Sequence, residues 1–349
     1  MKKQLFLTAM AALVMVSCSE ENVLDTNKGN AIDFRAAMGT RAQETNTANM
    51  SSIYVTALDA RNENLFSDQL FSKSGNFFTS TPAYYWPGDG STLTFYAYSP
   101  SKTDLGGTLT ITSATKKLTD FSPATDISNQ KDFVTIKATG NKTNETSGVQ
   151  LQFEHRLVQI EVKAKNTNEG YQYKVKGVRI GMPVSKGTFD FDANTWTLNS
   201  EKTNYEVTYE TERMLNGMPA SIMKTDDDNA MLIPQQLTAW AAATDKTNVA
   251  KGAYLAVKVK ITTKAGAHVY PVANGGDYDW VAVPIETNWV AGNKYVYTLD
   301  FSNGAGKVDP EKVVDPDDNY QPGDDILGGA IKFTVNVTDW TEQAENINM

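Results

Sequence analysis

The chain has 349 residues with an apolar content of 40%, which is enough for two folded domains with cores of their own. Its formal net charge of −9 repels phosphate backbones, and no stripe of lysine and arginine stands out, which argues against a nucleic-acid partner. The only cysteine is Cys18, so an intramolecular disulfide is excluded and packing alone must hold the domains together.

The N-terminus carries an export signal. Lys2 and Lys3 precede an apolar run from Leu5 to Val16, and Ser17-Cys18-Ser19 follows at once. The run is too short to cross a bilayer as a helix, which takes roughly 20 residues, but it fits the apolar region of a secretory signal. The segment resembles a bacterial lipoprotein signal, which implies cleavage before Cys18 and lipidation of Cys18. A plain signal peptide with an incidental cysteine is the alternative.

A short apolar–polar segment, Ile32 to Phe34, is followed by Arg41–Ala42 within a polar run. Taken alone, Arg41 fits two interpretations, a solvated charge or a place where the chain is cut. Because it lies between the lipid site and the first folded domain, a protease could reach it there. The bond between Arg35 and Ala36 is a second candidate, but it is less accessible if the apolar segment is paired as a strand.

Beyond residue 50, apolar and polar residues alternate with a period of two, as in half-buried antiparallel strands. The clearest apolar sets are Leu255, Val257, Val259 and Ile261; Tyr295, Tyr297, Leu299 and Phe301; and Ile331, Phe333, Val335 and Val337. Turn sequences separate such segments, among them Pro87-Gly88-Asp89-Gly90, Asn274-Gly275-Gly276-Asp277 and Asn303-Gly304. Many short strands with frequent turns predict an all-β protein built of β-sandwiches rather than a parallel α/β sheet.

A polar segment at 140–148 is the best internal boundary, and it divides a first domain, 42–146, from a second, 147–349. The second domain opens with LQFEHRLVQIEVKA, in which Leu151 and Phe153 share one parity and Ile160 and Val162 the other. A β-bulge near Leu157–Val158 would return both sets to the same face, so we expect one bulged strand here.

The inventory of reactive residues argues against an enzyme, and we predict no catalytic residue, no metal and no cofactor. His155 shares an apolar face with Phe153, and His268 has no ligand partner at a suitable spacing, so both are expected to be structural. Two acidic segments, 225–229 and 309–325, fit either solvated loops or oxygen ligands for Ca²⁺. The aromatic run 84–86 fits either core packing or stacking on sugars, and a glycoside hydrolase with two acids is a third, weaker alternative.

Several motifs together resemble the fimbrillin family, the type V pilins of Bacteroidetes and their accessory subunits. They are, in chain order, Ser17-Cys18-Ser19, Ile32-Asp33-Phe34 with Thr40-Arg41-Ala42, Ala83-Tyr84-Tyr85-Trp86-Pro87, Leu93-Thr94-Phe95-Tyr96-Ala97-Tyr98, Leu151-Gln152-Phe153-Glu154-His155-Arg156-Leu157, Trp289-Val290-Ala291-Gly292-Asn293-Lys294-Tyr295, and Ile331 through Trp340. Their order and spacing cover nearly the whole chain.

The resemblance implies two tandem transthyretin-like antiparallel β-sandwich domains after a signal peptide, 1–17, and a leader, 18–41. It also implies a non-enzymatic pilus subunit that is exported to the outer membrane as a lipoprotein and cut after Arg41 by an Arg-specific surface protease. Other fimbrial subunits, the outer membrane before processing, and a host or bacterial surface receptor would be its partners, and the fimbrium would be its final location.

In that mechanism, cleavage removes the first strand of the N-terminal domain, and a strand from a neighbouring subunit fills the groove. Ile32 and Phe34 are then the candidates for the removed strand. Ile331, Phe333, Val335 and Val337 are the candidates for the donated strand, unless that segment belongs to the chain's own second domain. The alternative function is a lipid-anchored surface glycan-binding protein of a polysaccharide-uptake system, which needs exposed aromatic platforms and no cleavage.

Overall fold

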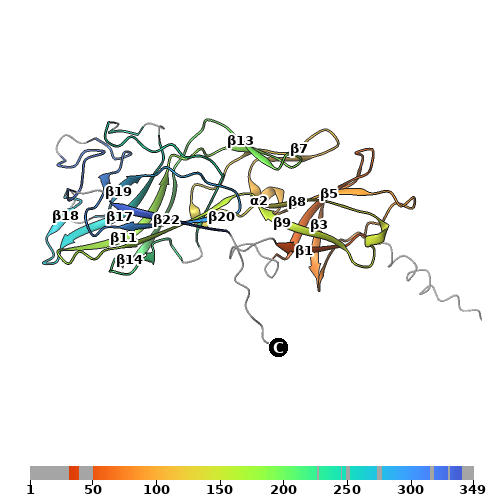
Figure 1. Cartoon of the computed structure of the whole chain (residues 1–349), viewed down its shortest axis with the longest axis horizontal. Helices are drawn as coiled ribbons and strands as arrows, with labels where there is room; N and C mark the ends of the chain where they lie inside the picture. Colours follow the sequence, from red (N-terminus) through yellow and green to blue (C-terminus); the bar gives the residue numbers. More distant parts are fainter. Residues whose placement is uncertain are drawn as a thin grey trace, which may run out of the picture.

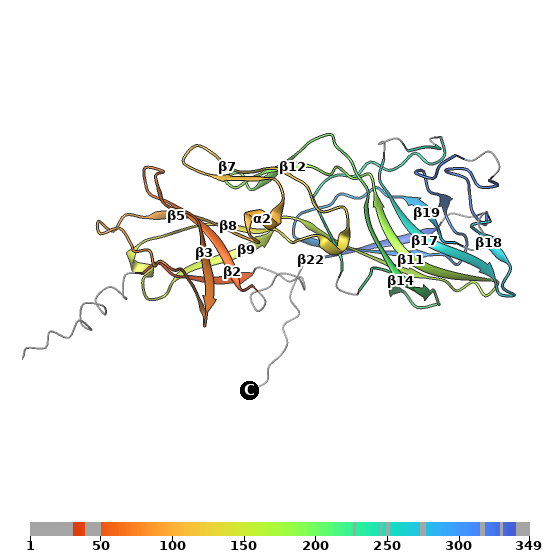
Figure 2. The same ribbon diagram turned by 180° about the vertical axis from the view of Figure 1, so that it is seen from behind.

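The computed structural model describes residues 31–38, 50–225, 228–244, 246–248, 252–272, 277–314, 318–328 and 331–339. The predicted signal peptide, Cys18 and the Arg41–Ala42 bond lie outside these residues. The described chain is all-β and elongated, with two bodies side by side along its long axis (Figures 1 and 2). Its one described α-helix, α2 (Lys102–Leu105), is a single turn, and no helix among the described residues is long and apolar enough to cross a membrane.

The first body is a closed barrel, in which β1, β4, β3, β2, β5, β8 and β9 follow one another around the wall. Its strands are β1 (Phe34–Met38), β2 (Ser52–Leu58), β3 (Asn64–Ser74), β4 (Phe77–Thr79), β5 (Leu93–Ser99), β8 (Val134–Gly140) and β9 (Val149–His155). Neighbours pair antiparallel except β1 and β9, which run parallel. Inward aromatic residues fill the barrel, and Phe34, Phe71 and Phe95 are fully buried.

The second body consists of two sheets that share one apolar core. One sheet has the order β15 (Ala220–Ser221), β10 (Val158–Lys165), β20 (Asn293–Asp300) and β22 (Lys332–Asp339), and β16 (Ala230–Leu232) also pairs with β10. The other has the order β14 (Tyr205–Met214), β11 (Tyr171–Gly181), β17 (Tyr254–Thr263), β19 (Asp279–Pro284) and β21 (Lys307–Val308), and β18 (His268–Tyr270) pairs with β17. The alternating segments at 255–261 and 295–301 therefore form buried strands, as predicted.

A four-stranded sheet connects the two bodies, with the order β13 (Thr195–Leu198), β12 (Gly187–Asp190), β7 (Lys116–Phe121) and β6 (Thr108–Ile111) (Figure 1). Two of its strands come from the first half of the chain and two from the second. Beneath it, Phe133 packs against Phe189 with ring centroids 5.5 Å apart. Two 3₁₀ turns, Ile127–Asn129 and Lys142–Asn144, lie in the loops that flank β8.

The chain passes from the first body to the second after β9, which lies later in the sequence than the predicted boundary between residues 146 and 147. β9 pairs with β8 and β1 in the barrel, whereas β10 pairs with β20 in the second body, so the chain crosses at Arg156 and Leu157. The expected single bulged strand over this segment is wrong. The parity of the apolar residues changes because two strands with different partners meet here, and each has its own core to face.

Candidate functional site

The predicted leader strand is an integral part of the barrel wall. β1 lies between β9, with which it pairs in parallel from Phe34↔Val149 to Met38↔Phe153, and β4, which it meets at Phe34↔Phe78. Among the described strands, β9 has no other partner on that side. β1 is thus the element that closes the barrel.

Phe34 anchors this strand in the core. Its ring is fully buried, and it meets Phe71 at 4.8 Å and Phe95 at 5.0 Å between centroids, in both cases edge to face. Burial of one phenylalanine contributes about 1.5–3 kcal/mol, and edge-to-face pairs add about 0.5–1.5 kcal/mol each. Ile32, which is 1% exposed, enters the same core one inward position earlier.

Backbone hydrogen bonds extend the pairing ahead of β1. The Ile32 N–H donates to the Tyr84 carbonyl at 2.8 Å, and the Asp33 carbonyl accepts from the Val149 N–H at 2.9 Å. The segment is therefore paired at both edges over residues 31–34, and over Arg35–Met38 its only partner among the described strands is β9. A strand that is hydrogen-bonded along an edge is a poor protease substrate, because a protease binds its substrate as a free strand.

The outward side chains of β1 fit less well. The Arg35 guanidinium carbon lies 4.4 Å from the centre of the Phe77 ring, while its Nε is buried and donates no hydrogen bond among the described residues. Burial also raises the pKa of the Asp33 carboxyl above its usual range. An unsatisfied buried donor costs about 1–3 kcal/mol, so the leader strand carries a defect in its own docking.

The second predicted strand, β22, occupies a different position. It pairs antiparallel with β20, from Lys332↔Asp300 to Asp339↔Asn293, and it is the last of the described strands on its side of the sheet. Ile331 is 4% exposed, but Phe333 and Val335 are only half-buried and Val337 is 49% exposed. The Phe333 ring meets that of Tyr297 at 6.3 Å between centroids. The candidate donor strand is therefore part of the chain's own second body, the alternative that the sequence left open.

The two candidate strands end at the same place. The last residue of β1, Met38, lies opposite Phe153, near the end of β9. The last residue of β22, Asp339, lies opposite Asn293 at the start of β20. That part of β20 pairs with the start of β10, where Gln159 lies opposite Lys294. Both C-terminal ends therefore lie at the junction of the bodies, and Figure 1 shows β1 and the end of β22 there.

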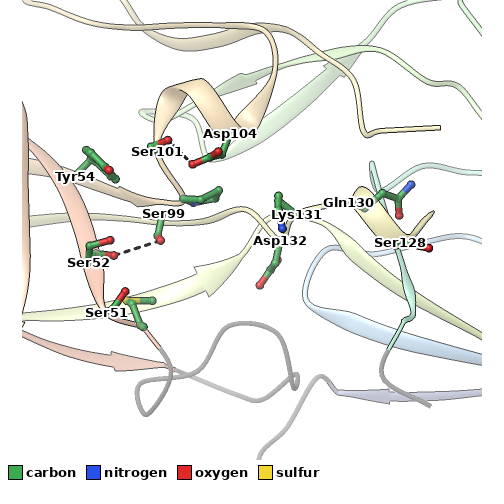
Figure 3. Close-up of a pocket in the computed structure, with 12 residues that line it drawn as sticks. Ser51, Ser52, Tyr54, Ser99, Ser101, Asp104, Ser128, Gln130, Lys131 and Asp132 are labelled. Atoms are coloured by element: carbon green, nitrogen blue, oxygen red, sulfur yellow. Dashed lines mark hydrogen bonds between the residues drawn. The ribbon is translucent and has the colours of Figure 1, made fainter. Parts of the chain in front are cut away.

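A pocket of about 440 Å³ also lies at this junction, and it is lined mainly by polar residues (Figure 3). Ser51 and Ser52 come from the start of β2, Ser99 from the end of β5, and Asp132 from the loop before β8. None of the predicted site residues that the structure describes lines it. His155 is buried beside this loop, with its Nδ1 2.7 Å from the Asp132 carboxylate, so it packs internally as expected, although its charged partner was not foreseen. His268 is exposed on β18.

The described carboxylates of the second acidic segment face basic side chains. Asp309 contacts Arg179, Asp318 accepts from Lys312 at 2.9 Å, and Asp325 from Lys307 at 2.7 Å. No group of three or more histidine, cysteine, aspartate and glutamate side chains suited to a metal occurs among the described residues. In the first acidic segment, Asp226 and Asp227 lie outside the described residues.

The aromatic run 84–86 is mostly part of the barrel. Trp86 is 6% exposed and meets Phe95 at 6.0 Å, Tyr84 is half-buried against Phe66, and Tyr85 is 47% exposed. A flat platform for a sugar needs adjacent rings that face solvent. In this run only one ring, that of Tyr85, does so.

Sequence reasoning missed the residues that receive β1. Phe71 and Phe95 form the walls around Phe34, and Phe77 covers Arg35. Phe95 belongs to one of the motifs that carry the family resemblance, but no local signal shows which strand inserts beside β9. The connecting sheet was missed for the same reason, because its pairs join residues far apart in the chain.

A fimbrillin-like family model matches residues 40–340, a span that begins just after β1. The chain belongs to the fimbrillin-like family. It is 26% identical over 281 residues to the fimbrium subunit Fim1C of Phocaeicola vulgatus, which covers 66% of this chain and 73% of that protein. The crystal structure of a fimbrial protein from Bacteroides vulgatus is similar with a TM-score of 0.55 and 17% identity, over 89% of this chain and 100% of that one. That likeness supports the fold alone.

Proposed function

We propose that this fimbrillin-like protein is a structural, non-enzymatic subunit of a surface fimbrium that contributes to adhesion. It reaches the outer membrane as a lipoprotein attached through Cys18, its two bodies correspond to transthyretin-like domains, and cleavage of the Arg41–Ala42 bond prepares it for assembly. β1 then leaves the barrel, and a strand from a neighbouring subunit takes its place. Family membership and the relatedness to a fimbrium subunit support this proposal.

The observation that carries the proposal is the position of β1. The strand holds Phe34 in the centre of the barrel and pairs at both edges, yet only residues 39–49 join it to the rest of the barrel. A cut within that segment breaks the covalent link and leaves the strand bound by non-covalent contacts alone. Its loss would expose the edges of β4 and β9 and the apolar core between them, which another strand can fill by β-augmentation.

The geometry favours Arg41 over Arg35 as the cut site. The Arg35–Ala36 bond lies inside β1, where Arg35 pairs with Gln150 and Ala36 with Leu151, so it is not available as a free strand. Cleavage there would also leave part of the strand attached to the body. We infer that Arg35 is protected while β1 is docked.

The test is to incubate the purified precursor with an Arg-specific protease and to determine the new N-terminus and the oligomeric state. We expect Ala42 as the new N-terminus and multimers that survive SDS, because exchanged strands bury a core. An Arg41→Lys variant should resist the protease while keeping the charge. If that variant multimerises as well as the wild type, cleavage at Arg41 has no role in assembly. Enzymatic hydrolysis of a glycan by the chain would contradict the non-enzymatic assignment.

A further inference from the structure

The barrel wall has a second apolar core on its outer side. Along β5, Phe95 and Ala97 point into the barrel, whereas Tyr96 and Tyr98 point outward and are also buried. The outer cluster around these two tyrosines is shared with the connecting sheet, which lies along this side of the barrel (Figures 1 and 2). β5 is therefore packed on both of its faces.

Aromatic rings from both halves of the chain form this outer cluster. Phe133 directly precedes β8, and its ring lies 5.5 Å from that of Phe189 on β12. The Trp196 ring on β13 lies 5.2 Å from that of Phe121, and its Nε1 donates to the Arg156 carbonyl at 2.8 Å. Among the described residues, none from β1 belongs to this cluster, so the loss of β1 removes nothing from it.

One carboxylate holds the turn of the β12–β13 hairpin against the barrel. Asp192, in that turn, accepts from the Tyr96 hydroxyl at 2.7 Å and from the Lys137 Nζ at 2.6 Å. Tyr96 lies on β5 and Lys137 on β8, so a single side chain binds two neighbouring strands of the wall. Asp190 fixes the turn itself, because its carboxylate accepts from the N–H groups of Asp192 and Ala193, both at 2.9 Å. The hairpin thus presents the Asp192 carboxylate in a fixed position.

The strands that the hairpin contacts must stay folded when β1 leaves. Without β1, the described barrel becomes an open sheet in the order β4, β3, β2, β5, β8 and β9, with β5 and β8 inside it rather than at its edges. Its inner core then loses Ile32 and Phe34. An open sheet needs an apolar face that is covered by another layer to remain folded. The outer cluster and the contacts of Asp192 supply that cover without any contribution from β1.

We propose that the β12–β13 hairpin is a brace that keeps the barrel wall folded after β1 has left, with Asp192 as the residue that positions it. The groove then keeps its shape for the incoming strand and does not collapse or unfold. In the intact chain β1 supports the same wall from inside, so the brace contributes little there. This inference rests on the proposed function, because the need for a brace arises only when β1 leaves.

The first test loosens β1 within the full-length chain. Phe34→Ala and Asp192→Ala are combined in a double-mutant cycle, with amide hydrogen exchange in β5 and β8 as the measurement. We expect the double variant to exchange about tenfold faster than the product of the two single effects, because each support compensates for loss of the other. Glu201→Ala is the matched control for Asp192→Ala, since it removes a carboxylate that pairs with Lys186 at 2.9 Å, and its effect should multiply with that of Phe34→Ala. Phe34→Leu, which leaves a smaller cavity, gives a milder second cycle. Effects of Asp192→Ala that simply multiply in both cycles would overturn the brace.

The second test follows the processed chain. Wild type and Asp192→Ala are treated with the Arg-specific protease, and hydrogen exchange in β5 and β8 is compared before and after cleavage. We expect the variant to exchange about tenfold faster than wild type after cleavage, and to differ from it by less than about twofold before cleavage. An equal difference before and after cleavage would make Asp192 an ordinary structural contact and overturn the brace. If the cleaved wild type neither releases its leader nor multimerises, the proposed function fails, whereas the cycles in the full-length chain still test the brace.

Discussion

The sequence Ala-Ile-x-Phe occurs at residues 31–34, where it leads into β1, and at residues 330–333, where it leads into β22, yet the two strands differ in their surroundings. β1 has neighbours on both edges and a phenylalanine that is fully buried, whereas β22 has one neighbour and a phenylalanine that is half-buried. The difference shows that the place of a strand in its sheet, rather than its residues, sets how much of the strand is buried. β1 therefore closes a core, and β22 lies at the edge of its sheet among the described strands.

The largest expected effect is the loss of stability when the phenylalanine of either strand is replaced by alanine. Phe34→Ala should lower the free energy of unfolding by about 3–5 kcal/mol, because it leaves a cavity between Phe71 and Phe95. Phe333→Ala should lower it by about 1 kcal/mol, because the side chain is half-buried at a sheet edge. Urea denaturation of the unprocessed chain measures both. Equal losses would mean that β22 is held as firmly as β1.

The next effect is the strain caused by replacing a glycine that packs beside either strand with alanine. Gly148 has φ +70°, and a Cβ there would lie 3.1 Å from the Phe77 ring and 3.3 Å from the Asp33 carbonyl oxygen. Gly148→Ala should therefore strain the start of β9 by about 1–3 kcal/mol and speed amide hydrogen exchange in β1.

Gly306 provides the matched case, because it has φ +77° and a Cβ there would lie 2.8 Å from Ile331 Cδ1. Gly306→Ala should speed exchange in β22 and leave β1 unchanged. If either substitution loosens both strands equally, the strands are coupled and the comparison between them does not hold.

A smaller effect, a gain in the stability of β1 in the barrel, is expected from Arg35→Met. The substitution removes a buried Nε that makes no hydrogen bond among the described residues, which relieves a cost of about 1–3 kcal/mol. It also loses a cation–π contact with Phe77, which stabilises by about 0.5–1 kcal/mol. Docking of β1 should tighten by about 1 kcal/mol, which slows leader release after cleavage roughly fivefold. The time course of leader release, followed by mass spectrometry, measures this. Lys332→Met, at an exposed position of β22, is the control and should change the rate of leader release by less than twofold. Faster release from Arg35→Met would mean that the buried Arg35 Nε does not weaken the binding of β1.

The smallest effect depends on pH. Burial raises the pKa of Asp33 in the folded chain, so the folded state binds a proton more readily than the unfolded state does. The contribution of Asp33 to stability is then fully present below its unfolded pKa of about 3.9 and is lost as pH rises through the folded value. Relative to β22, hydrogen exchange in β1 should become slower as the pH falls toward 4, after correction for the intrinsic exchange rate. Asp33→Asn should abolish that trend, and its persistence in the variant would assign it to another group.

Local patterns predicted much of this fold. The period-two alternation at 255–261 and 295–301 predicts strands with a buried apolar set, and the apolar residues Ile32 and Phe34 indicate a buried strand near the N-terminus. These predictions succeed because alternation reflects a single strand facing one core. The segment at 151–164 shows the limit of that reasoning, since its change of parity marks two strands in different sheets rather than one bulge.

By itself, the sequence determined the all-β character and the alternating apolar residues of single strands, because both depend on residues that are near one another in the chain. Only the tertiary structure decided that β1 inserts in parallel beside β9, that Phe71 and Phe95 receive Phe34, and that β22 is the last described strand on its side of the sheet. These contacts join residues far apart in the chain, and burial in a shared core selects them. The same pattern therefore yields a buried strand at one end of the chain and a half-exposed strand at the other.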